Sequence, residues 1–404
     1  MKKVSVKLIP SIIAGFLLAG FIVNAQNSST SHIFQYSNKN LNTITTAVPF
    51  LMIAPDARAG GLGDAGVSSI PDANSLHWNP AKYAFIEKDM GFAVSYSPWL
   101  RALVNDISLA YLSGYKKIGK DQAIAASLLY FSLGDITFTD IIGNTIGQFK
   151  PSEYAVDLCY SRKFSNVISG GVSLRYIHSN LTGGQFVGGA ESHAGNSVAT
   201  DVSAYYQKDF DFGKMPAKLG VGINISNIGA KISYTETTQR DFLPINLRFG
   251  PTLTTNLDEY NSLSIMVDIN KLLVPTPPIY YTDSLGTHIL SGKDPDVGIV
   301  SGIFQSFSDA PGGFKEEIRE FTFSTGMEYW YDKQFAIRGG FFYEDKTKGN
   351  RKFLTLGAGL KYNVFGLDFA YLVPIEQRNP LENTLRFTLL FDFDAFKEQN
   401  NKKE

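Results

Sequence analysis

Three glycines in the N-terminal part of the chain have the spacing of a phosphate-binding loop. Gly61, Gly63 and Gly66 match the pattern G-x-G-x-x-G, in which backbone N–H groups contact the phosphates of a dinucleotide. That chemistry requires a strand directly before the glycines and a helix after them. Residues 57–60 (Ala-Arg-Ala-Gly) do not have the pattern of a strand. We therefore interpret the glycines as positions where backbones pack closely, and we expect no cofactor.

Other residue types that carry chemistry are present but are not grouped. The five histidines have no metal-ligand spacing, and the single Cys159 excludes a disulfide framework or a cysteine-based metal site. No pairing of a nucleophile with a base stands out. A formal net charge of −1 does not indicate the basic surface that nucleic-acid binding requires. We predict a non-enzymatic protein that binds neither a metal nor nucleic acid.

The elements that must position these residues show an alternation of apolar and polar side chains. In 384–393, for example, Leu385 and Phe387 lie on one side of a strand, and Arg386 and Thr388 lie on the other. Segments of about ten residues with this pattern are typical of barrels that have lipid outside and a polar interior. The sequence predicts an all-β fold, a transmembrane antiparallel barrel of about 14 strands, at 90–97, 106–116, 122–134, 152–163, 167–180, 197–208, 217–228, 244–254, 261–270, 319–330, 334–344, 352–363, 365–373 and 384–393.

The connections between these strands alternate in length. The connections after odd-numbered strands are mostly long, at 135–151, 181–196, 229–243, 271–318 and 374–383. Those after even-numbered strands are mostly short, and the turn 209–216 is the exception. Outer-membrane barrels have short periplasmic turns and long external loops. We therefore expect the long loops at the cell surface, both termini in the periplasm, and lipid and lipopolysaccharide around the wall. Tyrosine and tryptophan near strand ends are expected at the lipid–water boundary, namely Tyr111, Tyr115, Tyr154, Tyr160, Tyr205, Tyr206, Tyr329, Trp330 and Tyr331.

Four regions are predicted along the chain. Residues 1–25 have the basic start, apolar run and small-residue cleavage site of a secretory signal peptide. Residues 26–89 do not alternate and are rich in small residues, which suits a plug inside the barrel. The barrel occupies 90–394, and 395–404 form a polar tail.

Charged residues on inward positions leave two interpretations open. They include Arg175, Arg248, Arg338, Lys361 and Arg386, together with single Asp and Glu residues. Confined charges need partners, so we favour a network that ties the wall to the plug. The alternative is a polar translocation path.

The loop 271–318 is longer than a simple connection requires, and such loops tend to be functional. Exposed apolar and aromatic clusters mark partner sites, but the loop could also bury these side chains itself. The first external connection, 98–105, could contribute to the same patch. The candidate contact residues are Trp99, Leu100, Pro277, Pro278, Ile279, Tyr280, Tyr281, Phe304, Phe307 and Phe314.

The segment from Pro55 to Gly66, followed by Asp72-Ala73-Asn74 and by Trp78-Asn79-Pro80-Ala81, resembles the N-terminal signature of the PorV family. These are outer-membrane barrels of the type IX secretion system of Bacteroidetes, related to the FadL fatty-acid transporters. The Asn-Pro-Ala part is shared across the wider FadL-like group, and the longer signature is more specific. Its plug residues here are Asp56, Arg58, Gly61, Gly63, Asp64, Gly66, Trp78, Asn79 and Pro80.

The resemblance implies a function in protein secretion. PorV-like proteins bind the C-terminal signal domain of cargo that leaves the translocon barrel, SprA (also called Sov). They carry the cargo to the attachment complex that contains PorU. The alternative is a FadL-type channel for hydrophobic small molecules. Inward positions that are mostly Gly, Ser, Thr or charged disfavour that alternative.

Overall fold

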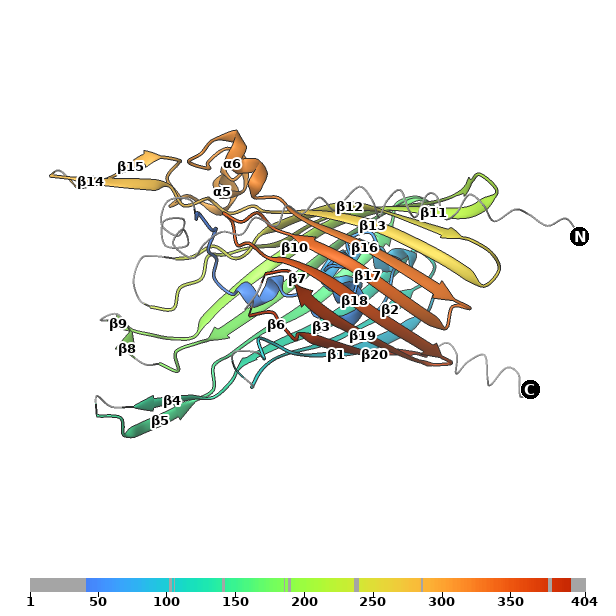
Figure 1. Cartoon of the computed structure of the whole chain (residues 1–404), viewed down its shortest axis with the longest axis horizontal. Helices are drawn as coiled ribbons and strands as arrows, with labels where there is room; N and C mark the ends of the chain where they lie inside the picture. The colour runs from blue at the N-terminus through green and yellow to red at the C-terminus, as the bar shows by residue number, and fades with distance from the viewer. Residues whose placement is uncertain are drawn as a thin grey trace, which may run out of the picture. The chain divides into compact units, whose positions relative to one another are not determined.

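The computed structural model describes residues 41–101, 104, 106–139, 142–184, 186–187, 190–235, 240–284, 286–376 and 380–393. The proposed signal peptide, residues 26–40 and the tail 395–404 lie outside these residues. Within them, fourteen antiparallel strands form one closed barrel (Figure 1). The strands are β1 Met90–Pro98, β2 Ile107–Ile118, β3 Gln122–Leu133, β6 Ser152–Lys163, β7 Ile168–Asn180, β10 Gly195–Phe212, β11 Met215–Gly229, β12 Asn246–Asn256, β13 Asn261–Leu272, β16 Thr322–Tyr331, β17 Phe335–Tyr343, β18 Lys352–Tyr362, β19 Phe365–Pro374 and β20 Leu385–Asp392.

This architecture confirms the predicted fold class and all fourteen strands. The barrel closes because β20 pairs with β1, for example Phe391 with Phe92. Strand β6 shows why the alternation predicted the strands. Leu158 is 63% exposed on the outer face, whereas the neighbouring Asp157 is buried in the lumen. An apolar outer face and a polar inner face are what a strand needs when lipid covers one side only.

The connections differ from the prediction in one place. Strands β10 and β11 extend toward each other and leave only Gly213 and Lys214 between them, not the predicted turn 209–216. The charged residues at 208–211 look like a loop in the sequence, but these ends of the strands lie where both faces are exposed. All turns after even-numbered barrel strands are therefore short, and we call this end of the barrel the turn end.

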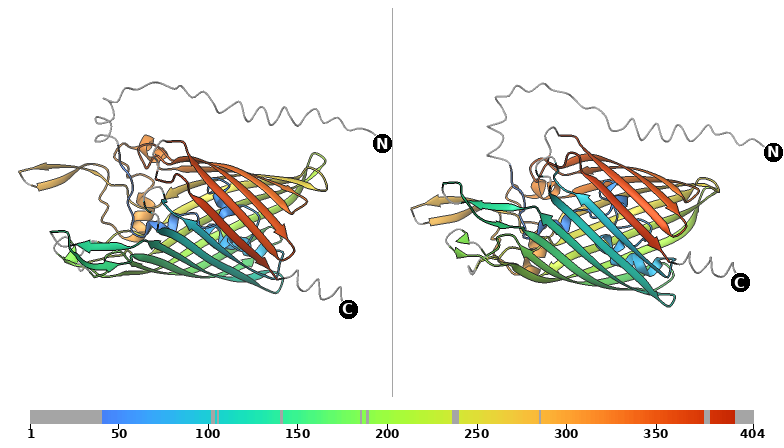
Figure 2. Two further views of the ribbon diagram at one scale, coloured as in Figure 1. Left: turned by 60° about the horizontal axis from the view of Figure 1, so that its bottom comes forward. Right: turned by 90° about the horizontal axis from the view of Figure 1, so that it is seen from below.

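The other end carries the long connections, and we call it the loop end. Three of them contain two-stranded hairpins: β4 Ile136–Thr139 with β5 Thr145–Phe149, β8 Phe186–Val187 with β9 Ala190–Glu191, and β14 Ile279–Asp283 with β15 Gly286–Ser291. The connection from β13 to β16, residues 273–321, also contains the helices α5 Ile299–Gln305 and α6 Phe314–Arg319. The hairpins β4–β5 and β14–β15 both project beyond the barrel wall at this end (Figure 2).

The expectation that tyrosine and tryptophan near strand ends face lipid agrees with the exposed Tyr160 and Tyr331, but it was wrong for four other residues. Tyr111, Tyr115, Tyr205 and Trp330 are buried and face the lumen. Tyr115, for example, stacks on Tyr83 with the ring centroids 5.5 Å apart. The lumen is filled by another part of the chain, so an aromatic ring on an inward position finds packing partners there.

Residues 42–89, which we call the lumen segment, lie inside the barrel (blue in Figure 1). They form four short helices: η1 Pro49–Met52, α3 Ala57–Gly60, α4 Ser75–Trp78 and η2 Pro80–Phe85. The contacts of α3 are with β18, β19 and β20, and those of η2 are chiefly with β6, β7 and β10. Among the described residues, no helix has the length and apolar character of a membrane span.

The lumen segment crosses the barrel from end to end. Asn42 donates its backbone N–H to Thr347 O at the loop end (3.0 Å), whereas Asp89 O accepts from Lys117 N near the turn end (2.8 Å). The chain therefore enters this part of the structure at the loop end and leaves it at the turn end, where β20 ends at Asp392. Residues 26–40 lie outside the described residues, so the prediction that both termini are periplasmic stays a prediction.

Candidate functional site

The first group of sequence-predicted residues lies around Asp56 and Trp78. Asp56 caps α3, because its carboxylate accepts from Ala59 N (2.9 Å), and it also accepts from Trp78 Nε1 (2.6 Å). The indole of Trp78 also packs on the Arg248 guanidinium of β12, 4.5 Å from the ring centroid. Asp56 and Trp78, 22 residues apart, thus join α3 to α4 and to the wall.

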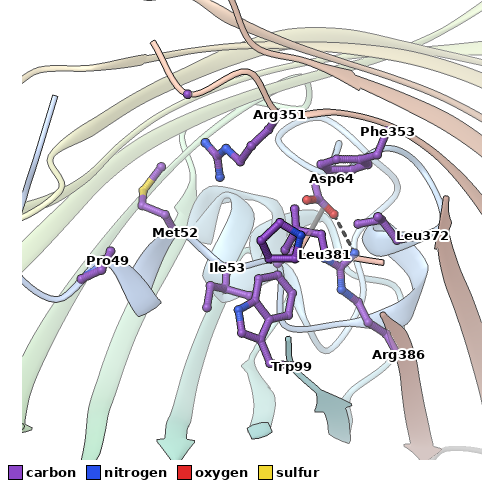
Figure 3. Close-up of a pocket in the computed structure, with 13 residues that line it drawn as sticks. Pro49, Met52, Ile53, Asp64, Trp99, Arg351, Phe353, Leu372, Leu381 and Arg386 are labelled. Carbon is purple, nitrogen blue, oxygen red and sulfur yellow. Dashed lines mark hydrogen bonds and ion pairs between the residues drawn. The ribbon is translucent and has the colours of Figure 1, made fainter. Parts of the chain in front are cut away.

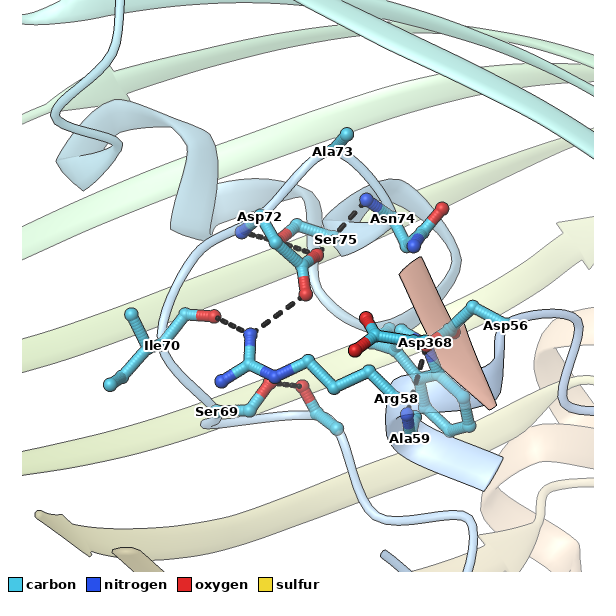
Figure 4. Close-up of polar contacts among 12 residues, drawn as sticks. Asp56, Arg58, Ala59, Ser69, Ile70, Asp72, Ala73, Asn74, Ser75 and Asp368 are labelled. Atoms are coloured by element: carbon cyan, nitrogen blue, oxygen red, sulfur yellow. Dashed lines mark hydrogen bonds and ion pairs between the residues drawn. The ribbon is translucent and has the colours of Figure 1, made fainter. Parts of the chain in front are cut away.

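Arg58 makes the strongest link between the lumen segment and the wall. Its guanidinium contacts Glu328 of β16 through two hydrogen bonds of 2.9 and 2.8 Å. It also contacts Asp72 (2.8 Å) and the carbonyl of Ile70 (2.9 Å), as Figure 4 shows. Glu328 is fully buried and also accepts from Arg338 Nε at 2.7 Å. A buried carboxylate that is shared by two guanidiniums is neutralised in place.

The glycines of the signature lie where backbones approach closely. A Cβ on Gly66 would be 2.5 Å from the Trp78 ring, and one on Gly63 would be 2.6 Å from the backbone of Phe341. Gly63 also has a φ of +70°. A Cβ on Gly61 would lie 3.1 Å from the Cα of Gly357. This agrees with close backbone packing as the reason for the glycines.

The remaining signature residues also bind the wall or order the segment. Asp64 accepts from Arg386 Nη1 of β20 at 2.8 Å. Asn79 caps η2 through Ala81 N (3.0 Å), while its amide donates to Ala204 O of β10 (3.1 Å). Pro80 occupies the first turn of η2, where its missing N–H costs nothing. All nine signature residues therefore belong to the packing of the lumen segment, and the geometry supports the network interpretation of the inward charges.

The second group lies in the connection 273–321, which is built on a buried charged cluster. Lys271 at the end of β13 contacts Glu320 (2.5 Å) and Glu317 (3.3 Å). Lys348, from the connection between β17 and β18, contacts Glu320 (2.9 Å) and Glu316 (2.6 Å). We call these five residues the loop-base cluster. It fixes α6 against the wall and against the neighbouring connection.

Two further contacts complete this base. The side-chain amide of Asn42 donates to Glu316 Oε1 (3.0 Å) and to Pro277 O (3.1 Å), so the start of the lumen segment is attached to the same cluster.

Burial alone would raise the pKa of Glu316, but hydrogen bonds from Lys348, Gly312 and Asn42 lower it. Burial raises the pKa of the nearby Asp309 to about 6, and Glu317 and Glu320 act in the same direction.

On this base the aromatic residues of the connection are exposed. Phe304 is 73% and Phe314 is 79% exposed, so the loop does not bury these two side chains itself. We call the exposed residues of the hairpin β14–β15 and of the segment around α5 and α6 the loop patch: Ile279, Tyr280, Tyr281, Val300, Phe304, Phe307, Phe314 and Ile318. Of the other predicted contact residues, Pro277 is half-buried and Pro278 is buried. Val300 and Ile318 were not among the predicted residues, although Val300 precedes Phe304 by four residues and Ile318 follows Phe314 by four.

Trp99 and Leu100 have a different position from the loop patch. Trp99 packs against residues of η1 and, with Arg386, lines a cavity of about 370 Å³ at the loop end (Figure 3). Leu100 lies in a turn, half-buried, with a φ of +50°. The cavity, which we call the mouth cavity, is lined by Pro49, Met52, Ile53, Ala54, Asp64, Trp99, Gly349, Arg351, Phe353, Leu372, Pro380, Leu381 and Arg386. No local sequence signal marks it, because its wall comes from six separate segments.

A closed fourteen-stranded antiparallel barrel with an apolar outer face and a filled polar lumen defines an outer-membrane β-barrel protein. Within the described residues, no three His, Cys, Asp or Glu side chains are arranged to hold a metal ion. The sequence matches the family "Type IX secretion system protein PorV" over residues 36–279, more than half of the chain. The chain belongs to the PorV family, and the resemblance seen in the signature residues is confirmed. This is a non-enzymatic family of outer-membrane components of type IX secretion.

Solved structures with a similar shape are also outer-membrane barrels. One is the toluene transporter TodX of Pseudomonas putida, with 11% identity, covering 87% of this chain and 98% of that one at a TM-score of 0.46. Another is a FadL homologue of Pseudomonas aeruginosa, with 13% identity, covering 87% and 99% at a TM-score of 0.44. A comparison with curated protein sequences found no match.

Proposed function

We propose that this chain binds the C-terminal signal domain of secreted cargo as it leaves the translocon barrel SprA (Sov). The chain then carries the cargo to the attachment complex that contains PorU. The observation that supports this most is the loop patch, because large apolar side chains lie exposed on a base that is fixed by buried ion pairs. A preorganised apolar surface loses little entropy when a partner binds.

The hairpin β14–β15 offers a second mode of contact. All five residues of β14 are exposed, and among the described strands β14 and β15 pair only with each other. A two-stranded hairpin has free edges to which a further strand can add. Strand addition would combine main-chain hydrogen bonds with apolar contacts to Tyr280 and Tyr281, which suits an extended segment of cargo.

This function requires the loop end to face the outside of the cell. Long connections on the external side and short turns on the periplasmic side are the rule for outer-membrane barrels. In this orientation lipid surrounds the wall, lipopolysaccharide lies beside the loop end, and β20 ends in the periplasm. The lumen segment acts as a plug, because its ion pairs and hydrogen bonds attach it to strands on several sides of the wall.

The experiment replaces residues 279–291, the hairpin β14–β15, by a short Gly-Ser linker. The loop-base cluster remains intact in this variant. We expect cargo to accumulate in the periplasm, while the purified variant keeps the heat-resistant mobility of a folded barrel. Affinity purification from membranes should then recover less translocon and less cargo than the parent chain does.

The hairpin β4–β5 supplies a matched control. Replacing residues 136–149 by the same linker also shortens a projecting hairpin, but it leaves the loop patch in place. We expect normal secretion from this control. Normal secretion from the β14–β15 variant, with the barrel folded, would count against the proposed function.

The rival function is a channel for hydrophobic small molecules. The mouth cavity is the observation that favours it, since apolar side chains form much of its wall. Uptake of a long-chain fatty acid in a deletion strain separates the two functions. A channel predicts reduced uptake, and the secretion component predicts unchanged uptake with a defect in secretion.

A further inference from the structure

The mouth cavity contains polar groups that the packing of the barrel does not fully use. The Arg386 side chain is 2% exposed, and its Nη1 donates to Asp64. Its Nε is buried and has no hydrogen-bond partner among the described residues. A buried N–H without an acceptor is costly, so a ligand atom that accepts from it gains that free energy on binding.

Asp64 gives the same wall an acceptor. Its carboxylate has about four lone-pair sites, of which the hydrogen bond from Arg386 uses one. Its side chain is 20% exposed where it lines the cavity. The wall therefore presents an unused cationic donor and a carboxylate acceptor next to each other, as Figure 3 shows.

The rest of the lining is largely apolar. Trp99, Phe353, Leu372 and Leu381 surround the polar pair, and Arg351 adds a second guanidinium that is held by Glu344 at 2.8 Å. A volume of about 370 Å³ accommodates a few side chains rather than a folded element. The ligand must then carry an anion, an N–H donor and an apolar side chain within a short length.

We propose that the mouth cavity binds the free carboxyl terminus of a polypeptide. The terminal carboxylate accepts from Arg386 Nε, the last peptide N–H donates to Asp64, and the last side chains contact Trp99, Phe353 and Leu381. A simple acyl chain with a carboxylate fits less well, since it brings the same charge but has no N–H donor for Asp64. This inference rests on the proposed function, because cargo that is recognised by its C-terminal domain brings such an end to the loop end.

The first test uses the purified protein in detergent and a fluorescent peptide that ends in Ser-Val-Leu-Val. The peptide is compared as the free acid and as the carboxamide. We expect the free acid to bind at least about tenfold more tightly, because only it pairs an anionic carboxylate with the Arg386 guanidinium. Equal binding of the two forms, or no binding of either up to about 1 mM, would overturn the proposal. Decanoate is the competing probe, and its binding without that of the peptide would assign the cavity to acyl chains.

A second test fills the cavity. Leu381→Trp places a large ring in it, and Ile375→Trp in the same connection is the matched control, because Ile375 is 54% exposed and does not line the cavity. We expect the free-acid peptide to bind at least about tenfold more weakly to the first variant and normally to the second. Equal binding to both variants would contradict the proposal.

A third arm separates this inference from the proposed function. A cargo signal domain with its natural end is compared with one that is extended by a hydrophilic tag. If neither domain binds the purified barrel but the peptide acid does, the cavity assignment stands and the proposed function fails. If both domains bind equally, the loop patch suffices and the cavity assignment fails.

Discussion

Arg58 of the lumen segment and Glu328 of β16 form a two-point ion pair inside the barrel, with N–O distances of 2.9 and 2.8 Å. The two residues are 270 positions apart in the sequence. Glu328 also accepts from Arg338, which in turn donates to Asp368 at 2.7 Å. The fold of the lumen segment thus depends on charges that lie on the wall.

Removal of Glu328 should destabilise the barrel more than removal of Arg58. Glu328→Gln leaves two buried guanidiniums short of a counter-charge, which costs about 3–5 kcal/mol. Arg58→Gln leaves Glu328 paired with Arg338, so we expect a smaller loss. The free energy of unfolding is measured by urea titration of the heat-resistant folded band. An equal loss for both variants would mean that Arg338 does not compensate Glu328.

Neighbouring glycines on β17 should respond differently to alanine. A Cβ on Gly340 would lie 2.1 Å from Gly63 N, whereas a Cβ on Gly339 meets only Thr355 O at 4.0 Å. We expect Gly340→Ala to displace the lumen segment and to cost about 1–3 kcal/mol, as overpacking does. Gly339→Ala is the matched control with little effect. Proteolysis of the lumen segment in the purified protein measures the displacement, and protection of both variants would contradict this packing.

The connection 273–321 should loosen as the pH rises through a mildly acidic range. Because burial raises the pKa of Asp309 from 3.8 to about 6, its favourable contribution is fully present below pH 3.8. That contribution is lost as the pH rises toward 6. The Thr276 amide donates to Asp309 Oδ2 at 3.1 Å. Its hydrogen-exchange rate, corrected for the intrinsic rate, measures the loss of this contribution as the pH rises. Asp309→Asn should remove the dependence, and an unchanged profile in this variant would show that Asp309 is not its source.

The direction of the lumen segment predicts which side of the membrane Thr45 occupies. Thr45 is exposed near Asn42 at the loop end, and Lys214 is exposed in the turn between β10 and β11. With the loop end outward, Thr45→Cys should react with a membrane-impermeant maleimide in intact cells. Lys214→Cys should react only after lysis. The natural Cys159 is buried and contributes little background. The reverse labelling pattern would invert the proposed orientation.

The strands of the wall were predictable because their signal is local. Lipid on one face and polar contents on the other impose a period of two within each segment, so Leu158 and Asp157 reveal their sides without any partner. The lumen signature also carried family information, and its glycines were correctly assigned to close packing. Both kinds of signal are present in a few consecutive residues.

The tertiary structure alone decided what the inward and loop residues contact. Asp268 accepts from Gly66 N at 2.7 Å across 202 residues of sequence, and nothing near either residue indicates the other. Composition could not show whether Phe304 covers the mouth or faces solvent, because the answer depends on which face of α5 packs on the core, and Ile299 and Ile303 do so in the cluster with Phe242. The mouth cavity likewise exists only where separate connections meet. Alternation is a property of one strand, whereas these contacts need the barrel to close before the partners come within reach of each other.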